Sequence, residues 1–186
     1  MDRRQRKTRE AIFRAFGELL SKKDVSQITV GEIIQRADVG RATFYAHFPT
    51  KDFLLKELCE ELFCHVLDAT QNVCSHRHIF ECETQGSVFL HLFRHMQKND
   101  NHVLELLTCG SNDLFLRYFK DGLVALIQKQ TDAFEISRPV DVPQSFWVNH
   151  VASAFVQAVC WWSENEMTCT AEEINEYFLR SLFLVE

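Results

Sequence analysis

The sequence between residues 28 and 53 places two short helical patterns on either side of a three-residue break. The first pattern follows Thr29, whose side chain can cap a helix. Apolar residues then recur at the i, i+3, i+4 and i+7 positions of an amphipathic helix, namely Val30, Ile33, Ile34 and Ala37. The break ends at Gly40, which allows either the positive φ of a tight turn or an uncrowded start of the next helix. This spacing predicts two helices joined by a tight turn.

The second helix is expected from Arg41 to Phe48, and Pro49 ends it. Phe44 and Phe48 are four residues apart, so they share one face and are expected to point to the core. Polar side chains occupy the remaining surface. Two short helices with this turn and this division of faces have the layout of a helix-turn-helix DNA reader.

The polar side chains of this second helix have the chemistry of DNA contacts. Arg41 can bind guanine or a phosphate through two hydrogen bonds, and Thr43 offers a hydroxyl and a methyl group at groove depth. Tyr45, His47 and Lys51 suit phosphate contacts, which position a protein without reading the base sequence. Each residue alone fits an ordinary solvated surface equally well. The complete pattern, with its turn and caps, predicts binding to double-stranded DNA.

The charge distribution favours the same interpretation. Residues 1–56 hold 12 Lys and Arg against 7 Asp and Glu, a net charge of +5, whereas the remaining residues hold 8 against 19, a net charge of −11. The basic segment is therefore the one with the helix-turn-helix pattern. Five basic residues within residues 1–9 predict either an arm that contacts DNA or a frayed, solvated terminus.

The segment from Thr29 to Leu55, TVGEIIQRADVGRATFYAHFPTKDFLL, closely resembles the signature of the TetR/AcrR family of bacterial transcription regulators. The resemblance covers about the first third of the chain. It implies an all-α protein of about nine helices, with an N-terminal three-helix DNA-binding head and a C-terminal helical domain that binds a ligand and dimerises. It also implies a set of DNA contacts: Thr29, Arg41, Thr43, Tyr45, His47 and Lys51. Many members have Ser where this chain has Gly40, so a side-chain cap is missing here.

We therefore expect a DNA-binding domain in residues 1–50 and a ligand-binding and dimerisation domain in residues 51–186. A first helix is expected from about Arg4 to Leu20. A long amphipathic helix that follows Thr50 should link the two domains mechanically. A loop is expected around residues 71–85. Further helices are expected at residues 87–98, 101–109, 113–131, 143–166 and 171–184.

The last two of these helices carry broad apolar faces, which must be buried by more than their chain neighbours. One alternative is a helix in the centre of the body. The other is a homodimer, which helix-turn-helix proteins use to bind two half-sites, and which the family resemblance also implies. The predicted interface consists of Phe146, Phe155, Trp161, Trp162, Tyr177, Phe178 and Leu182.

The body between residues 58 and 131 is rich in Phe and contains several His. The Phe residues can simply fill the core. The family resemblance implies instead that this region binds a small-molecule effector, whose identity the sequence does not specify. The candidate ligand-binding residues are Phe63, His65, Phe89, His91, His95, Phe115 and Tyr118.

Known catalytic motifs are missing, including GxGxxG, GxxxxGK[ST] and GxSxG, so we expect neither an enzyme nor a cofactor. Residues 74–82, CSHRHIFEC, hold Cys and His at high density, but no pair of CxxC motifs and no HExxH occur. We therefore expect no metal, and a metal- or thiol-responsive sensor remains an alternative.

The sequence has no run of about 18 apolar residues and no apolar segment near its charged start, so we expect no membrane contact and a cytoplasmic location. Seven cysteines without a disulfide framework fit that compartment. The favoured function is a repressor that binds a palindromic operator and is released by a small molecule. An activator of the same fold, which recruits a partner protein, is the alternative.

Overall fold

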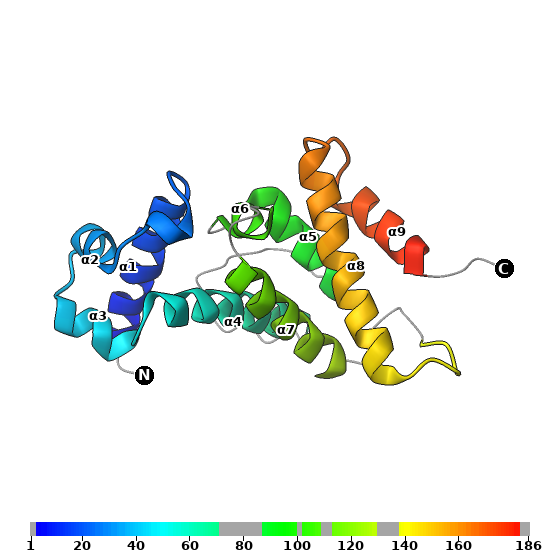
Figure 1. The fold of residues 1–186 in the computed structure, drawn as a ribbon, viewed down its shortest axis with the longest axis horizontal. Coiled ribbons are helices and arrows are strands. Elements are labelled where there is room, and N and C mark those ends of the chain that lie inside the picture. Colours follow the sequence, from blue (N-terminus) through cyan, green and yellow to red (C-terminus); the bar gives the residue numbers. More distant parts are fainter. Residues whose placement is uncertain (1–2, 71–86, 100–101, 109–112, 130–137, 183–186) are drawn as a thin grey trace.

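The structure is a computed structural model, and it describes residues 3–70, 87–99, 102–108, 113–129 and 138–182. This part of the chain contains nine α-helices, one short 3-10 helix and no strand (Figure 1). In chain order the helices are α1 (Arg3–Leu20), the 3-10 helix η1 (Val25–Gln27), α2 (Val30–Ala37), α3 (Arg41–His47), α4 (Lys51–Thr70), α5 (Val88–Lys98), α6 (Val103–Thr108), α7 (Asp113–Lys129), α8 (Gln144–Glu164) and α9 (Ala171–Leu182). The predicted all-α fold is confirmed.

The head consists of α1, α2 and α3 at one end of the molecule (Figure 1). Helix α1 packs against α2, and its apolar side meets the inward faces of the two shorter helices. The ring of Phe13 lies edge-on to Phe48, with 5.3 Å between ring centroids. The core of the head is formed by fully buried side chains: Ile12, Phe13, Phe16, Ile28, Ile33, Phe44 and Phe48.

Helix α4 begins a few residues after the end of α3 and runs from the head into the body (Figure 1). Thr50 caps its start, since the Thr50 hydroxyl accepts a hydrogen bond from the backbone N–H of Phe53 at 3.0 Å. Further along, α4 packs against α7 and α5. One continuous helix therefore connects the recognition region to the core of the body, as the sequence predicted.

The body is assembled from α5 to α9 around the second half of α4. Helix α8 contacts α6, α7 and α9, and α5 lies between α9 and α4. The body has several long helices, which bury more apolar area than short ones. Its core contains many large aromatic side chains. Its largest fully buried side chains are Phe89, Phe93, Phe115, Phe119, Phe155, Trp162 and Phe178.

The helix boundaries agree with the sequence to within two residues wherever the chain is described. Pro143 differs slightly, because it is the N-cap of α8 and the helix begins at the next residue. The predicted loop at residues 71–85 lies outside the described residues. Among the helices that the structure describes, none has the length and apolar character needed to cross a membrane.

Candidate nucleic-acid interface

Helix α2 begins with a reciprocal cap. The Thr29 hydroxyl accepts a hydrogen bond from the backbone N–H of Glu32, and the Glu32 carboxylate accepts one from the backbone N–H of Thr29 at 2.9 Å. Lys23 also binds this carboxylate. The Lys23 ammonium and the two Thr29 donors lower the pKa of Glu32 to about 2. Glu32 is thus ionised at neutral pH and holds the start of α2 in place.

The turn between α2 and α3 takes its left-handed residue from Asp38, with φ 52° and ψ 48°. Asp tolerates this region better than most residues. The Asp38 N–H donates to the carbonyl of Ile34, which closes α2. Gly40 instead has an extended backbone, with φ −73° and ψ 153°, and serves as the N-cap of α3. The possibility of a positive φ at Gly40 was wrong, and the alternative of an uncrowded helix start is confirmed.

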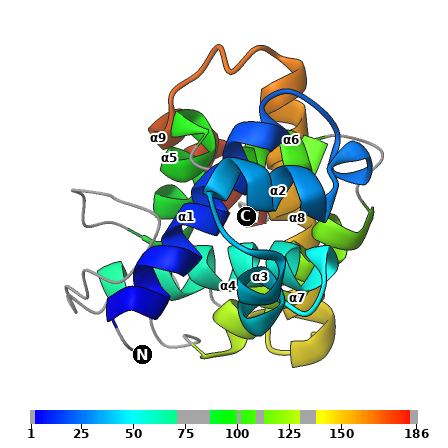
Figure 2. The same ribbon diagram turned by 90° about the vertical axis from the view of Figure 1, so that its left-hand side faces the viewer.

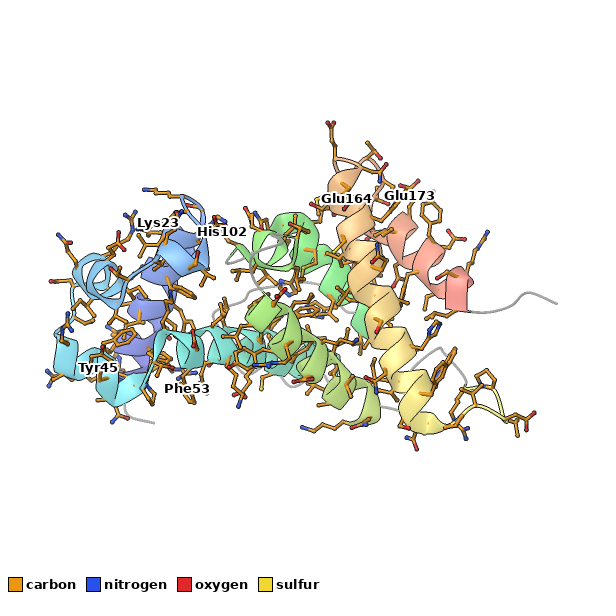
Figure 3. The ribbon with its side chains drawn as sticks, in the orientation of Figure 1. Lys23, Tyr45, Phe53, His102, Glu164 and Glu173 are labelled. Carbon is orange, nitrogen blue, oxygen red and sulfur yellow. The ribbon has the colours of Figure 1, made fainter. Side chains whose placement is uncertain are left out.

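Helix α3 separates an inner from an outer face as predicted. Phe44 and Phe48 are fully buried, which fixes the rotation of this short helix about its axis. On the outer side Arg41 and Thr43 are exposed. Tyr45 is 44% exposed although it is a large aromatic residue. In Figure 3, Tyr45 lies at the end of the molecule opposite the α8–α9 connection, and Figure 2 shows α2 and α3 in front of the body.

Two of the three remaining predicted DNA contacts are partly buried. His47 is half-buried at the end of α3, whereas Thr29 is exposed. Lys51 is also half-buried, and its ammonium donates hydrogen bonds to the carbonyls of Val25 and Ile28, at 2.6 and 2.9 Å. Two of its three donors therefore fasten α4 to the segment before α2, a structural role that the sequence did not reveal.

The basic residues at the start of the chain are helical, because α1 begins at Arg3. They do not form an extended arm over the described residues. Arg9 forms ion pairs with Glu57 and with Glu61, the latter at 3.1 Å, and its guanidinium lies 5.0 Å from the ring centroid of Phe13. Arg9 consequently connects α1 to α4.

The predicted ligand-binding residues lie inside the body. Six are buried and Tyr118 is half-buried. Three of the buried residues are His65 on α4 and His91 and His95 on α5, at 8%, 2% and 2% exposure. Burial is the largest cause that lowers the pKa of His91, to about 3, and the positive charges of His95 and His65 lower it further. The structure thus brings His65 of α4 together with His91 and His95 of α5 in one buried polar cluster.

The predicted dimer residues fall into two groups. Four lie in the subunit's own core: Phe155, Trp162, Phe178 and Leu182. Three remain on the surface as large apolar side chains: Phe146 at 64%, Tyr177 at 51% and Trp161 at 45% exposure. Periodicity could not separate these groups, because α8 is apolar over much of its circumference and the apolar face of α9 is broad. The surface group alone has area to offer a partner.

Four cysteines lie in the described residues, and all are reduced thiols: Cys59, Cys64, Cys160 and Cys169. Burial raises the pKa of the Cys59 thiol and that of the Cys160 thiol, which keeps both protonated and poorly nucleophilic near neutral pH. The Cys- and His-rich segment at residues 74–82 lies outside the described residues.

Comparison with known sequences gives two matching family models. Residues 12–58 match the model of bacterial regulatory proteins of the tetR family, and residues 83–183 match the C-terminal region of a group of transcriptional regulators. Two curated relatives from Bacillus subtilis (strain 168) are HTH-type transcriptional regulators whose functions are uncharacterised. YxbF is 36% identical over 69 residues, which cover 37% of this chain and 18% of YxbF. YvdT is 32% identical over 59 residues, which cover 32% of this chain and 30% of YvdT. The chain thus matches less than a third of the length of either relative.

Comparison with solved structures covers nearly the whole chain. A TetR transcriptional regulator from Streptococcus agalactiae 2603V is 32% identical, with a TM-score of 0.72 over 97% of this chain and 96% of that one. FadR from Bacillus subtilis, in complex with stearoyl-CoA, is 14% identical with a TM-score of 0.61 over 92% and 96% of the two chains. FadR from Thermus thermophilus, in complex with lauroyl-CoA, is 20% identical with a TM-score of 0.56 over 96% of each. The two FadR proteins share the fold with this chain.

Proposed function

The chain belongs to the TetR family of bacterial transcriptional regulators, and from this premise we propose that it is a repressor that binds a palindromic operator as a homodimer and is released by a small molecule. The observation that carries the proposal is the geometry of α3. Two buried Phe side chains hold the helix, while Arg41, Thr43 and Tyr45 extend from its outer side.

In this proposal α3 enters the major groove. Arg41 and Thr43 contact base edges, and Tyr45, His47 and Lys51 contact phosphates. Thr29 contacts a phosphate from the start of α2, where backbone N–H groups and the helix dipole favour an anion. Lys51 reaches a phosphate with the one ammonium donor that is not directed at a backbone carbonyl. Residues 1–50 act as the DNA-binding domain and residues 51–186 as the effector-binding and dimerisation domain.

The homodimer is proposed to form through the surface group on α8 and α9. Phe146, Trp161 and Tyr177 are large apolar residues exposed by about half or more, so these two helices have apolar area that a partner can cover. A two-fold dimer would present two α3 helices to successive turns of the major groove. Trp161→Glu should abolish dimerisation, whereas Arg117→Glu on the exposed side of α7 should not, and size-exclusion chromatography distinguishes the two results. An unchanged dimer for Trp161→Glu would refute this interface.

Release is proposed to act through α4. This helix contacts α5 and α7 in the body and carries the head at its other end. An effector that prefers one position of α4 shifts the population of dimers whose heads match the operator spacing. Two proteins of the same fold were solved with bound acyl-CoA, which supports a small-molecule effector without naming the one used here.

The experiment that tests DNA reading is selection of bound sequences from a random duplex library by the purified full chain. We expect enrichment of a palindrome whose half-sites lie about one helical turn apart, or a multiple of that. Absence of any enriched sequence, with a folded dimer in hand, would refute the proposal. The position of genomic matches relative to promoters then separates repression from activation by a recruited partner.

A pair of variants tests the assigned helix. The double substitution Arg41→Ala and Tyr45→Ala should lower operator affinity at least about 100-fold, because it removes a base contact and a phosphate contact, each base contact contributing about 1–3 kcal/mol. Arg117→Ala removes the same charge from the body and should leave affinity unchanged at fixed salt. Retained binding by the double variant, with unchanged helicity, would show that α3 is not the reading helix.

A further inference from the structure

The body holds one compact group of metal-ligating side chains within the described residues. His65, His91 and His95 are all buried, and one ligand atom of each lies within 4.8 Å of the other two. The Nε2 atoms of His91 and His95 are 3.0 Å apart. The ring of His65 stands almost perpendicular to both, with centroids 5.2 Å from His91 and 4.9 Å from His95. The three imidazoles therefore converge from two helices on one small volume.

Helical spacing explains half of this arrangement. His91 and His95 are four residues apart on α5, so their side chains lie on one face, as in helical zinc sites that use two His at i and i+4. Their rings are stacked with 17° between planes. His65 comes from α4, which packs against α5. Only the contact between these helices supplies the third imidazole, which no spacing along the chain indicates.

Three imidazoles form a ligand set with a definite preference. Imidazole nitrogen suits Zn²⁺ and the other late divalent transition metals, and three His with one further position is a common zinc arrangement. For a metal 2.0–2.1 Å from each nitrogen, tetrahedral angles put the nitrogens about 3.4 Å apart. The observed separations, from 3.0 Å to at most 4.8 Å, bracket that value.

We propose that His65, His91 and His95 bind one divalent transition-metal ion, Zn²⁺ being the preferred one, and thereby join α4 to α5. A fourth position is left for water or an anionic ligand. Because α4 also carries the head, the metal fixes the position of the helix through which release is proposed to act. This regulatory consequence rests on the proposed function, whereas the metal site does not.

The first test uses the full chain freed of metal and titrated with Co²⁺ as a spectroscopic substitute for Zn²⁺. We expect one equivalent to bind with visible bands of tetrahedral coordination and without thiolate charge transfer, and Zn²⁺ to displace it. Thiolate bands, or no saturable binding, would overturn the site. X-ray absorption of the zinc-loaded protein should show imidazole scattering and no sulfur ligand, and this result does not depend on any variant.

Variants locate the metal. His91→Gln and His65→Gln should each weaken Zn²⁺ binding at least about 100-fold, since loss of a direct ligand should exceed the 10–100-fold effect of an outer partner. His150→Gln replaces an exposed His on α8 and should change nothing. A chain with Cys74, His76, His78 and Cys82 replaced should bind Zn²⁺ like the parent. Binding lost in that chain and kept in His91→Gln would overturn the assignment.

The coupling to DNA is measured separately with the selected operator. Zn²⁺ should change operator affinity by at least about fivefold in the parent chain and not in His91→Gln, at equal salt. Zn²⁺ bound at the three His without any change in operator affinity would overturn the regulatory role and leave the site. A chain that binds no duplex with or without Zn²⁺ would refute the proposed function, while the Co²⁺ titration still decides the site.

Discussion

The head and the body differ in the kinds of contact that join their helices. In the head, charged and polar contacts add to a small apolar core: Arg9 with Glu57 and Glu61, Lys23 with Glu32, Arg36 with Glu18, and Lys51 with two backbone carbonyls. In the body, contacts between aromatic rings join many helices, for example Phe93 with Phe155 at 4.6 Å and Phe89 with Phe178 at 4.8 Å between centroids. Arg94 on α5 also pairs with Glu172 on α9, at 2.8 Å and near the surface.

Helix length accounts for the difference. Helices α2 and α3 have eight and seven residues, too few to bury a large apolar face and also display an outer face to DNA. Ion pairs and caps at their ends add orientation without using the outer face of α3. The longer α7 and α8 bury rings along their length, and the only buried polar side chains among the described residues are the three His. A cluster of polar side chains in this apolar core therefore calls for a functional explanation, whereas the polar contacts of the head are explained by the helices that they join.

The largest expected effect comes from the aromatic core of the body. Trp162→Ala should lower the free energy of unfolding by about 3–5 kcal/mol. Trp162 is fully buried, its ring lies edge-on to Phe93, and its Nε1–H donates to the carbonyl of Cys169 at 2.9 Å. Urea unfolding at one fixed protein concentration measures the change.

The neighbouring Trp161 provides the matched control, because it is the same residue type on the same helix but 45% exposed. Trp161→Ala should cost much less subunit stability, measured at a concentration where both variants have the same oligomeric state. Equal losses for the two variants would contradict the division between core and surface on α8.

A smaller loss is expected at the junction between head and body. Arg9→Ala should lower the free energy of unfolding by about 1.5–3 kcal/mol, since it leaves the carboxylates of Glu57 and Glu61 without their common partner. Arg6→Ala is the control, because its pair with Glu10 is about half exposed and should contribute less than about 0.5 kcal/mol. If both substitutions had the same small effect, polar contacts would not hold the head, and its small apolar core would have to suffice.

The sequence predicted the features that depend on residues a few positions apart. It did not predict the contacts between residues of separate helices. The helices, the turn and the burial of Phe44 and Phe48 follow from spacing of three or four residues, and all are confirmed. The contact of Arg9 with α4 and the convergence of His65 with α5 join residues from separate helices, and no local pattern encodes them.

The prediction of the dimer residues on α8 and α9 was incomplete for another reason. Helix α8 is apolar over much of its circumference, so periodicity could not tell Phe155, which faces the core, from Phe146, which faces outward. The predicted interface accordingly mixed core and surface positions, and only the fold separates them.

The cap of α2 predicts a pH dependence that belongs to the head. Folding lowers the pKa of Glu32 from 4.5 to about 2, so its contribution to stability is complete above about pH 4.5 and is lost as the pH falls toward 2. Glu32→Gln should therefore reduce stability at about pH 5 and have little effect near pH 2. Unfolding free energies of both chains across this window measure the difference. A constant difference at every pH would mean that the carboxylate charge has no part in the cap.

The smallest effect is expected at the start of α3, which has no side-chain N-cap, whereas the start of α2 has one. Gly40 has the backbone of an ordinary N-cap, and an added Cβ would approach only the Thr43 hydroxyl, at 3.6 Å. Gly40→Ser should therefore add a few tenths of a kcal/mol, because its hydroxyl can accept a backbone N–H of α3. Gly40→Ala adds the same Cβ without an acceptor, and should be about 1 kcal/mol less stable than Gly40→Ser. If the Ala variant were as stable as the Ser variant, the gain would come from the reduced conformational freedom of the unfolded chain. Of the two recognition helices, only α2 would then depend on a side-chain cap at its start.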